Sequence, residues 1–147
     1  MKSILILACA LIAGGLIPLQ SAVNAKFGQA VPHPLHATFV SFLGGLLGII
    51  VLLICLHPPL PTKQSLGEVP WYLYTGGLFG VVFVTTVLML VPRIGVATML
   101  ATALTGQLIV SMLVDHYGWF GAPVHPISGL RVAGLACLMA GVFLIRK

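Results

Sequence analysis

Five long runs of apolar residues follow one another along the chain, with short polar connections between them. Each of the first four has the length of about 20 mostly apolar residues that an α-helix needs to cross a bilayer. The fifth contains Arg131 one turn inside its edge, and it qualifies if that side chain extends to the membrane surface. The pattern predicts five membrane-spanning helices, at residues 3–25, 35–56, 71–91, 94–114 and 127–145.

The runs indicate helices rather than barrel strands, because they are about twice as long as a membrane strand and do not alternate between apolar and polar residues. Prolines mark their ends: Pro34 precedes the second run and Pro70 the third. Pro92 and Arg93 are expected to make a tight reversal that places the third and fourth spans side by side and antiparallel. The sequence therefore predicts an all-α integral membrane protein with one membrane domain over residues 1–147.

Composition agrees with a membrane protein. Hydrophobic residues make up 59% of the chain and charged residues 6%, and the mean hydropathy is +1.15, whereas soluble proteins average about 25% charged residues. The net charge of +5 comes from basic residues scattered singly, apart from the last two. They form no patch for nucleic acid, and we interpret them as anchors to the lipid headgroups. The three cysteines each lie within an apolar run and indicate neither a disulfide nor a metal site.

Polar side chains within the spans are the candidate functional groups, because each needs a hydrogen-bonding partner where there is little water. Gln107, Ser111 and Asp115 share one face of the fourth span. We predict that they line a solvent-reachable cavity, with Trp71 or Tyr74 as an apolar wall. In the alternative interpretation, the first two make interhelical hydrogen bonds, the acid is an interfacial charge, and the aromatic residues belong to an interfacial belt.

Three further polar residues join this candidate set of substrate-binding or cavity-lining residues. Gln20 and Asn24 lie four residues apart near the end of the first span, and Ser41 lies in the second. For the first two, the alternative is an ordinary interfacial position, because Lys26 follows immediately.

Small residues repeat every four positions in the fifth span, as Ala133, Cys137 and Gly141. Helices in a membrane associate through close backbone contact, which small residues permit. We expect this face to pack against another helix, either within the bundle or from a second protomer.

Catalytic and cofactor-binding motifs are missing from the sequence, so we expect neither an enzyme nor a cofactor. Asp115, His116 and His125 could in principle share a metal ion, but the first two are adjacent and diverge on a helix, which favours ordinary loop histidines and no metal. Glu68 and Asp115 are the two acidic residues, and neither lies near the middle of a span. A proton relay through a central carboxylate is therefore not predicted.

Short motifs occur in a distinctive order along nearly the whole chain. They are Gln20 to Asn24, Ser41-Phe42 with Gly44-Gly45, Pro70-Trp71 with Gly76-Gly77 and Gly80, Pro92 to Ala97, Gly106-Gln107-Leu108 with Ser111, Asp115 to Gly118, and Arg131 with Gly134 and Gly141-Val142. In this order the chain resembles the bacterial five-span YdcZ-like family of the drug/metabolite transporter superfamily. The resemblance implies a half-size transporter-like bundle, because larger members contain two five-span halves in inverted topology. Four-span multidrug exporters are more loosely similar, but the chain lacks their first-span Glu, which argues against proton-coupled export of cationic drugs.

Charge distribution bears on orientation, since five crossings place the termini on opposite sides of the membrane. The side of the N-terminus would carry three basic residues and the other side four, which are Lys2, Lys63 and Arg131 against Lys26, Arg93, Arg146 and Lys147. This difference is too small to fix an orientation by the positive-inside rule. We predict insertion both ways and an antiparallel homodimer; a paired homologous subunit and a parallel dimer are the alternatives.

The predicted function is that of a secondary transporter or half-transporter of a small solute, working by alternating access in the bacterial cytoplasmic (inner) membrane. The alternative is a non-transporting membrane scaffold or accessory subunit, which would use its small-residue faces to bind another protein.

Overall fold

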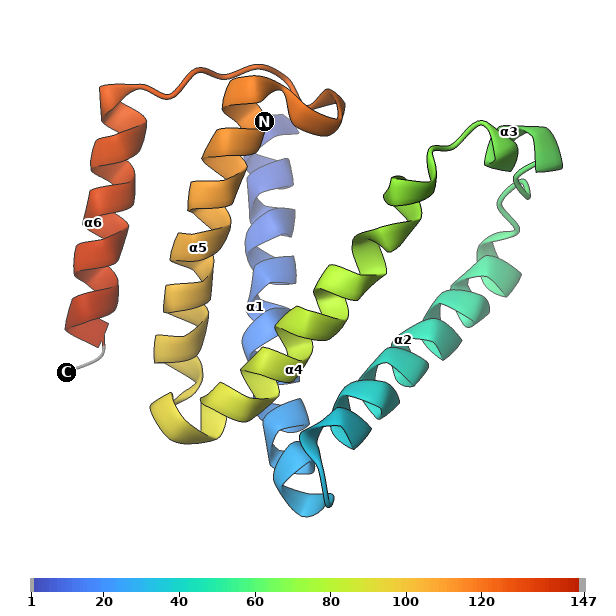
Figure 1. The fold of residues 1–147 in the computed structure, drawn as a ribbon, viewed down its shortest axis with the longest axis horizontal. Coiled ribbons are helices and arrows are strands. Elements are labelled where there is room, and N and C mark those ends of the chain that lie inside the picture. The colour runs from blue at the N-terminus through green and yellow to red at the C-terminus, as the bar shows by residue number, and fades with distance from the viewer. Residues whose placement is uncertain (1, 146–147) are drawn as a thin grey trace. The chain divides into compact units, whose positions relative to one another are not determined.

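The computed structural model describes residues 2–145, with side chains from Ile4 onward, and nearly all of these residues are helical (Figure 1). Two compact units make up the chain, Met1–Arg93 and Ile94–Lys147. The N-terminal unit contains α1 (Lys2–Ala30), α2 (Pro34–Leu56), the short α3 (Lys63–Gly67), the 3-10 turn η1 (Trp71–Thr75) and α4 (Gly76–Ile94). The C-terminal unit contains α5 (Val96–Tyr117), the 3-10 turn η2 (Trp119–Gly121) and α6 (Gly129–Ile145).

Within the described residues, four helical segments are long and apolar enough to cross a membrane: Ile4–Ala30, Pro34–Leu56, Trp71–Ile94 and Val96–Tyr117. Most of their large apolar side chains are exposed, as expected where lipid surrounds the helices. The all-α membrane architecture is thus confirmed. The predicted fifth span corresponds to α6, which has 17 residues and a length of about 26 Å. That is short of the hydrocarbon thickness of about 30 Å, so the count of five stays a prediction.

The helices extend beyond several of the apolar runs. The first continues past Lys26 to Ala30, and α4 continues through Pro92 to Ile94. The predicted reversal at Pro92 and Arg93 is therefore wrong in position, because the helical backbone is interrupted at Gly95. This residue has a φ of +81°, which glycine adopts without the steric penalty of a side chain. A proline in the last turn costs only one helical hydrogen bond, so it does not have to end the helix.

The helices α1, α2 and α4 of the N-terminal unit pack closely at one junction. Small residues allow it: a Cβ atom added to Gly28 would lie 2.9 Å from Cδ2 of Leu88. Helices that approach so closely bury their facing side chains and exclude lipid. The buried residues at this junction are Ser21 and Ala25 of α1, Ala37 and Thr38 of α2, and Val87, Leu88 and Val91 of α4.

Side-chain contacts set the register between α2 and α4. The hydroxyl oxygens of Thr38 and Thr85 are 3.0 Å apart, and Phe42 lies against Gly80, where an added Cβ atom would be 3.2 Å from Cζ. As the residue number increases along α2, the number of the contacting residue in α4 decreases. The two helices are therefore antiparallel, as Figure 1 shows.

The C-terminal unit is an antiparallel hairpin of α5 and α6. The first helix ends at Gly118, which has a φ of +63° and whose N–H binds the carbonyl of Val114. The turn η2 and then a segment without helix lead to Ser128, whose hydroxyl accepts a hydrogen bond of 3.4 Å from the N–H of Arg131 at the start of α6.

Candidate functional site

A groove of about 410 Å³ lies between α1, α2 and α4 of the N-terminal unit. Most of its wall is apolar, and the polar side chains come from α1 and α2. Among the described side chains, none that lines it is charged. The residues around it are Gln20, Ser41, Phe42, Gly45, Leu46, Ile49 and Val84.

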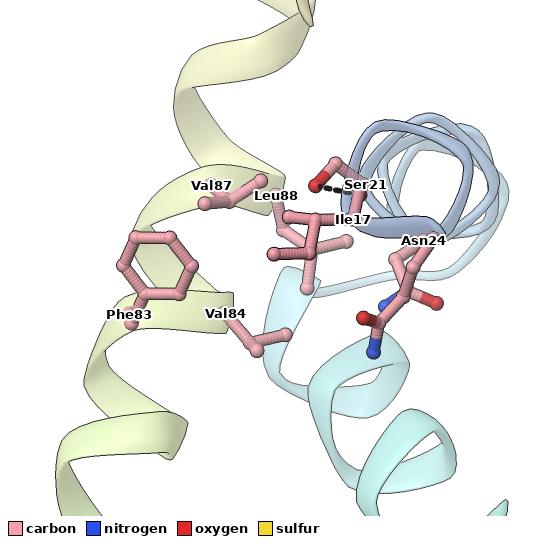
Figure 2. Close-up of a pocket in the computed structure, with 8 residues that line it drawn as sticks. Ile17, Ser21, Asn24, Phe83, Val84, Val87 and Leu88 are labelled. Carbon is pink, nitrogen blue, oxygen red and sulfur yellow. Dashed lines mark hydrogen bonds between the residues drawn. The ribbon is translucent and has the colours of Figure 1, made fainter. Parts of the chain in front are cut away.

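A second cavity of about 30 Å³ adjoins the groove between α1 and α4 (Figure 2). Gln20 and Val84 line both spaces and so form the wall between them. The smaller one has room for about one water molecule, and the side chains of Gln20, Ser21 and Asn24 offer it polar partners.

Hydrogen bonds among neutral groups connect the helices around these cavities. Nδ2 of Asn24 donates to Oγ of Ser41 over 2.9 Å and joins α1 to α2. The hydroxyl of Ser21 donates to the carbonyl of Ile17, one turn back, over 2.7 Å. The carboxamide of Gln20 makes no hydrogen bond to any other residue in the described part of the chain. Both its donor and its acceptor are therefore available.

Of the eight residues predicted as cavity-lining, the structure brings together Gln20, Asn24 and Ser41. An interfacial position for the first two does not follow from Lys26, because α1 continues four residues beyond it. Trp71 and Tyr74 lie apart from this group, before the N-terminus of α4, and are largely exposed. The hydroxyl of Tyr74 donates to the carbonyl of Leu66 over 2.9 Å and ties η1 to α3.

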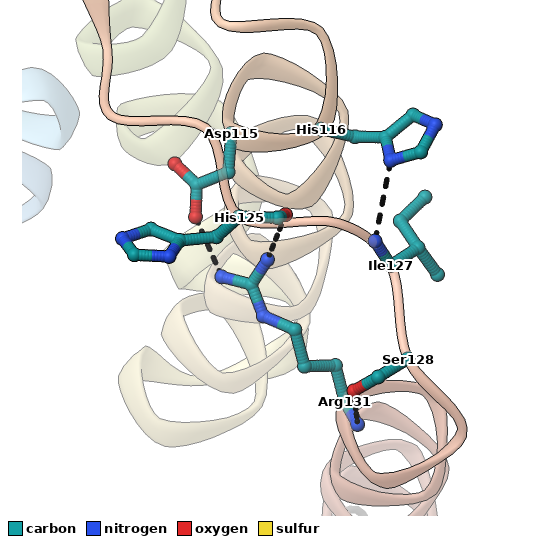
Figure 3. Close-up of polar contacts among 6 residues, drawn as sticks. All are labelled: Asp115, His116, His125, Ile127, Ser128 and Arg131. Carbon is teal, nitrogen blue, oxygen red and sulfur yellow. Dashed lines mark hydrogen bonds and ion pairs between the residues drawn. The ribbon is translucent and has the colours of Figure 1, made fainter.

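Charged side chains meet in the C-terminal unit, where α5 ends and α6 begins (Figure 3). Arg131 donates through Nη2 to Oδ2 of Asp115 over 2.6 Å and through Nη1 to the carbonyl of His125 over 2.8 Å. The N–H of His125 in turn donates to the backbone carbonyl of Asp115 over 2.9 Å. Arg131 thus closes the connection between the two helices, and we call this group the charged latch.

Two histidines adjoin the latch without forming a metal site. Nδ1 of His116 accepts a hydrogen bond of 3.2 Å from the N–H of Ile127, and the ring of His125 points away from that of His116 (Figure 3). Within residues 2–145, no three His, Cys, Asp or Glu side chains gather closely enough to hold a metal ion.

Gln107 and Ser111, the other predicted cavity residues of α5, are exposed. They make no hydrogen bond to another described residue, so their place in a cavity stays a prediction. A separate pocket of about 200 Å³ lies between α5 and α6, lined by Leu108 and Met112 on one side and Arg131, Gly134, Leu135 and Leu138 on the other.

The small-residue face of α6 is largely uncovered. Ala133 and Cys137 are exposed, and a Cβ atom added to Gly141 would meet nothing within 4 Å. That this face packs against a helix stays a prediction.

Comparison with known proteins gives the chain a family. The model of the family described as "Putative inner membrane exporter, YdcZ" matches residues 5–144. The chain belongs to this family. It is also 24% identical over 138 residues to the inner membrane protein YdcZ of Escherichia coli (strain K12), with 93% of the chain and 92% of that protein covered. No solved structure shows a significant match.

The family resemblance predicted from sequence is thus confirmed, as is a multi-pass protein of the inner membrane. The family is described as one of exporters and not of enzymes. The groove and the charged latch both lie inside the matched range.

Sequence reasoning missed two contacts. It treated Arg131 as a lone charge at the membrane edge and did not pair it with Asp115. A signal was available, since these residues lie at the facing ends of consecutive helices, which are antiparallel neighbours if the connection is short. It also left out Thr38 and Thr85, because a threonine that bonds its own helix looks the same in sequence as one that bonds a neighbour.

Proposed function

We propose that the chain is a secondary transporter that moves a small solute across the inner membrane by alternating access, as an antiparallel dimer. The observation that carries this proposal is the groove among three membrane helices, where the carboxamide of Gln20 has no hydrogen-bonding partner among the described residues. Polar groups at membrane depth are costly unless they are satisfied, and in membrane proteins they often mark solute pathways.

Membership of a family described as inner membrane exporters supports transport as the activity. A volume of about 410 Å³ also falls within the range of about 300–1,000 Å³ that is usual for small-molecule sites. The groove opens sideways, since Leu46 and Ile49 in its wall are each more than half exposed. A helix or a second protomer that covers and uncovers this side would give the alternating access that transport requires.

An antiparallel dimer is supported by the weak charge bias. The basic residues are scattered among the ends of the helices rather than concentrated on one side, and the positive-inside rule then gives little preference for either orientation. Two oppositely inserted copies would reproduce, as separate chains, the inverted repeats that many transporters carry within one chain.

Flux in reconstituted vesicles tests the transport proposal. Purified protein in liposomes is screened with a panel of radiolabelled or fluorescent small solutes, against empty liposomes. We expect protein-dependent movement of at least one solute that is reduced by Gly45→Leu, which places a side chain in the groove. The absence of protein-dependent flux across a chemically broad panel contradicts the proposal.

Orientation is tested separately in intact cells. The native Cys9, Cys55 and Cys137 are exposed, so they are first replaced by alanine, and a single cysteine is then placed near one terminus. A membrane-impermeant thiol reagent should label about half of the molecules if insertion occurs both ways. A single orientation, with no oppositely inserted partner in the membrane, contradicts the antiparallel dimer.

One observation favours a second candidate, a scaffold or accessory subunit. The uncovered face of Ala133, Cys137 and Gly141 is suited to close packing against another membrane helix. A stable complex with a different membrane protein, together with no flux in vesicles, would support this candidate over the transporter.

A further inference from the structure

We propose that the groove of the N-terminal unit binds an uncharged amphipathic solute, whose apolar body lies against Phe42, Leu46 and Ile49 and whose polar end is hydrogen-bonded by Gln20. This inference rests on the proposed transport function and names the class of substrate. It is carried by three features of the groove: the absence of charge, the free carboxamide and the sideways opening.

The absence of charge excludes ions as the natural ligands. No charged side chain of residues 4–145 lines the groove, and α2 contains no Lys, Arg, Asp or Glu. On α1, Lys26 lies six residues beyond Gln20, about two thirds of a turn round the helix and therefore on another face. An ionised solute would lose its hydration without gaining an opposite charge, which is far more costly than burying an apolar surface.

The free carboxamide supplies the polar contact. Asn24 and Ser41 use each other's side chains over 2.9 Å, so they are partly satisfied without a ligand. Gln20 has no partner among the described residues and lines both the groove and the cavity of one-water size. Its amide can therefore donate to, or accept from, a hydroxyl, carbonyl or amide of a ligand. A water in the smaller cavity would satisfy the remaining end of the same side chain.

The sideways opening suits a ligand that dissolves in the bilayer. Phe42, Leu46 and Ile49 lie on one face of α2 and are 38%, 54% and 57% exposed. An uncharged amphipathic molecule partitions into lipid and reaches such a wall from the side. Burying its apolar body there gives most of the affinity, and the single hydrogen bond gives orientation.

The test uses four molecules with the same ring system and different end groups. These are 1-naphthylmethanol, 1-naphthylmethylammonium, 1-naphthoate and 1-methylnaphthalene, which are an alcohol, a cation, an anion and a hydrocarbon. Binding to the purified full-length protein in nanodiscs is measured by equilibrium dialysis at pH 7, and partition into empty nanodiscs is subtracted. We expect the alcohol to bind at least about tenfold more tightly than either ion.

Two variants assign the binding to the groove. Gln20→Leu should weaken binding of the alcohol by about threefold to tenfold, the usual worth of one neutral hydrogen bond, and leave the hydrocarbon unchanged. Gly45→Leu should abolish binding of both. Gly48→Leu is the matched control, because it adds the same side chain to the same helix in open space and outside the groove.

Several results overturn the proposal. One is tighter binding of the cation or anion than of the alcohol, and another is equal binding by wild type and Gly45→Leu. If the hydrocarbon binds as tightly as the alcohol and Gln20→Leu changes neither, the groove holds lipid chains and the proposal is wrong. Should Gly45→Leu fail to fold, the response to Gln20→Leu decides by itself.

The assays separate this inference from the proposed function. Alcohol binding that follows the expected pattern, without flux of any solute in vesicles, would leave the site standing and refute transport. In the opposite case, Gln20→Leu and Gly45→Leu change neither the flux nor the binding of the alcohol. That result would support transport and refute this site.

Discussion

Within each of the two units, the helices are held together by a different kind of contact. In the N-terminal unit, neutral groups join the helices. They are the hydrogen-bonded pairs Asn24–Ser41 and Thr38–Thr85 and the closely packed Gly28. The C-terminal unit instead relies on the Asp115–Arg131 ion pair at the end of its hairpin. The neutral contacts join the last two turns of α1, the first turns of α2 and the middle of α4, whereas the ion pair joins the end of α5 to the start of α6.

This difference separates a binding role from a structural one. A groove without charge can accept a solute that already dissolves in lipid, at little desolvation cost. The charged latch has a different consequence: it neutralises an arginine in the first turn of the short α6, which would otherwise be costly at the membrane edge. The proposed solute site thus belongs to the N-terminal unit, and the latch anchors α6 to the end of α5.

The largest expected effect comes from Gly28→Leu in the N-terminal unit. Even a Cβ atom at this position would be 2.9 Å from Cδ2 of Leu88, which is buried, so a leucine must displace the Leu88 side chain or separate α1 from α4. We expect a loss of about 3 kcal/mol in the free energy of unfolding, measured by denaturant titration in mixed micelles.

Gly15→Leu on the same helix is the control, because an added Cβ atom there meets nothing within 4 Å. Its stability should stay close to that of the wild type. Equal stability of Gly28→Leu and Gly15→Leu would show that the junction of α1, α2 and α4 is not closely packed in the membrane.

The spans were predictable because each helix is uniformly apolar, and hydropathy alone marks such segments. Their ends were less so. Lys26 is compatible with one more turn of α1, since a lysine side chain extends along the helix toward the headgroups. Pro92 stands inside α4 because a proline close to a C-terminus costs little, and the permissive backbone of Gly95 ends the helix instead.

The polar residues of the site were predictable as a set, but their partners were not. Helical spacing places Gln20 and Asn24 on one face, yet it cannot say that the second bonds Ser41 and the first stays free. That choice depends on where α2 crosses α1, which the contact of small residues decides. The partner of Asp115 could not be predicted for the same reason. To pair it with Arg131, one must know the path of the whole connection between α5 and α6.

Breaking the charged latch is expected to have the next largest effect. Asp115→Asn removes the negative partner of Arg131, and the two side chains are 29% and 34% exposed. A buried pair broken in this way costs about 3–5 kcal/mol and a fully exposed one less than about 1, so we expect about 2 kcal/mol. Arg131→Gln should cost a similar amount, because it leaves the Asp115 carboxylate without its cation.

A double-mutant cycle isolates the pair. Asp115→Asn combined with Arg131→Gln should be less destabilised than the two single effects added together, with a coupling of about 1 kcal/mol. Lys63→Gln is the control, because no described acidic residue forms an ion pair with Lys63. Strict additivity would mean that the charges do not stabilise the hairpin.

The uncovered face of α6 gives the third prediction. Gly141→Leu should weaken self-association in lipid by about tenfold if this face packs against a second protomer, since a bulky side chain keeps the backbones apart. Energy transfer between labelled copies, measured over a range of protein-to-lipid ratios, gives the dissociation constant.

Ala136→Leu adds bulk to the same helix at an exposed position, about 100° round from Cys137. It should leave association unchanged. If both variants associate as the wild type does, the face of Ala133, Cys137 and Gly141 is not the dimer interface, and this prediction is wrong.

The smallest expected effect concerns two adjacent threonines of α4. The hydroxyl of Thr85 donates to the carbonyl of Val81 over 2.7 Å, and its oxygen lies 3.0 Å from that of Thr38, from which it can accept a hydrogen bond. Thr85→Val removes that acceptor and leaves the buried Thr38 hydroxyl with only the Pro34 carbonyl at 3.5 Å. Interhelical hydrogen bonds in membranes average about 0.6 kcal/mol, and we expect a loss of that size.

Thr86→Val is the matched control for this contact. Its hydroxyl bonds only the carbonyl of Val82, one turn back, over 2.8 Å, so its removal breaks no link between helices and valine fits the same space. Unfolding measurements should therefore place Thr86→Val at or slightly above wild-type stability and Thr85→Val below it. Thr38→Val should cost a similar amount and, combined with Thr85→Val, add little more, because the second change removes a bond that is already lost. Equal costs at positions 85 and 86 would mean that neutral hydrogen bonds do not join α2 to α4, and packing at the glycines would then have to hold the walls of the groove alone.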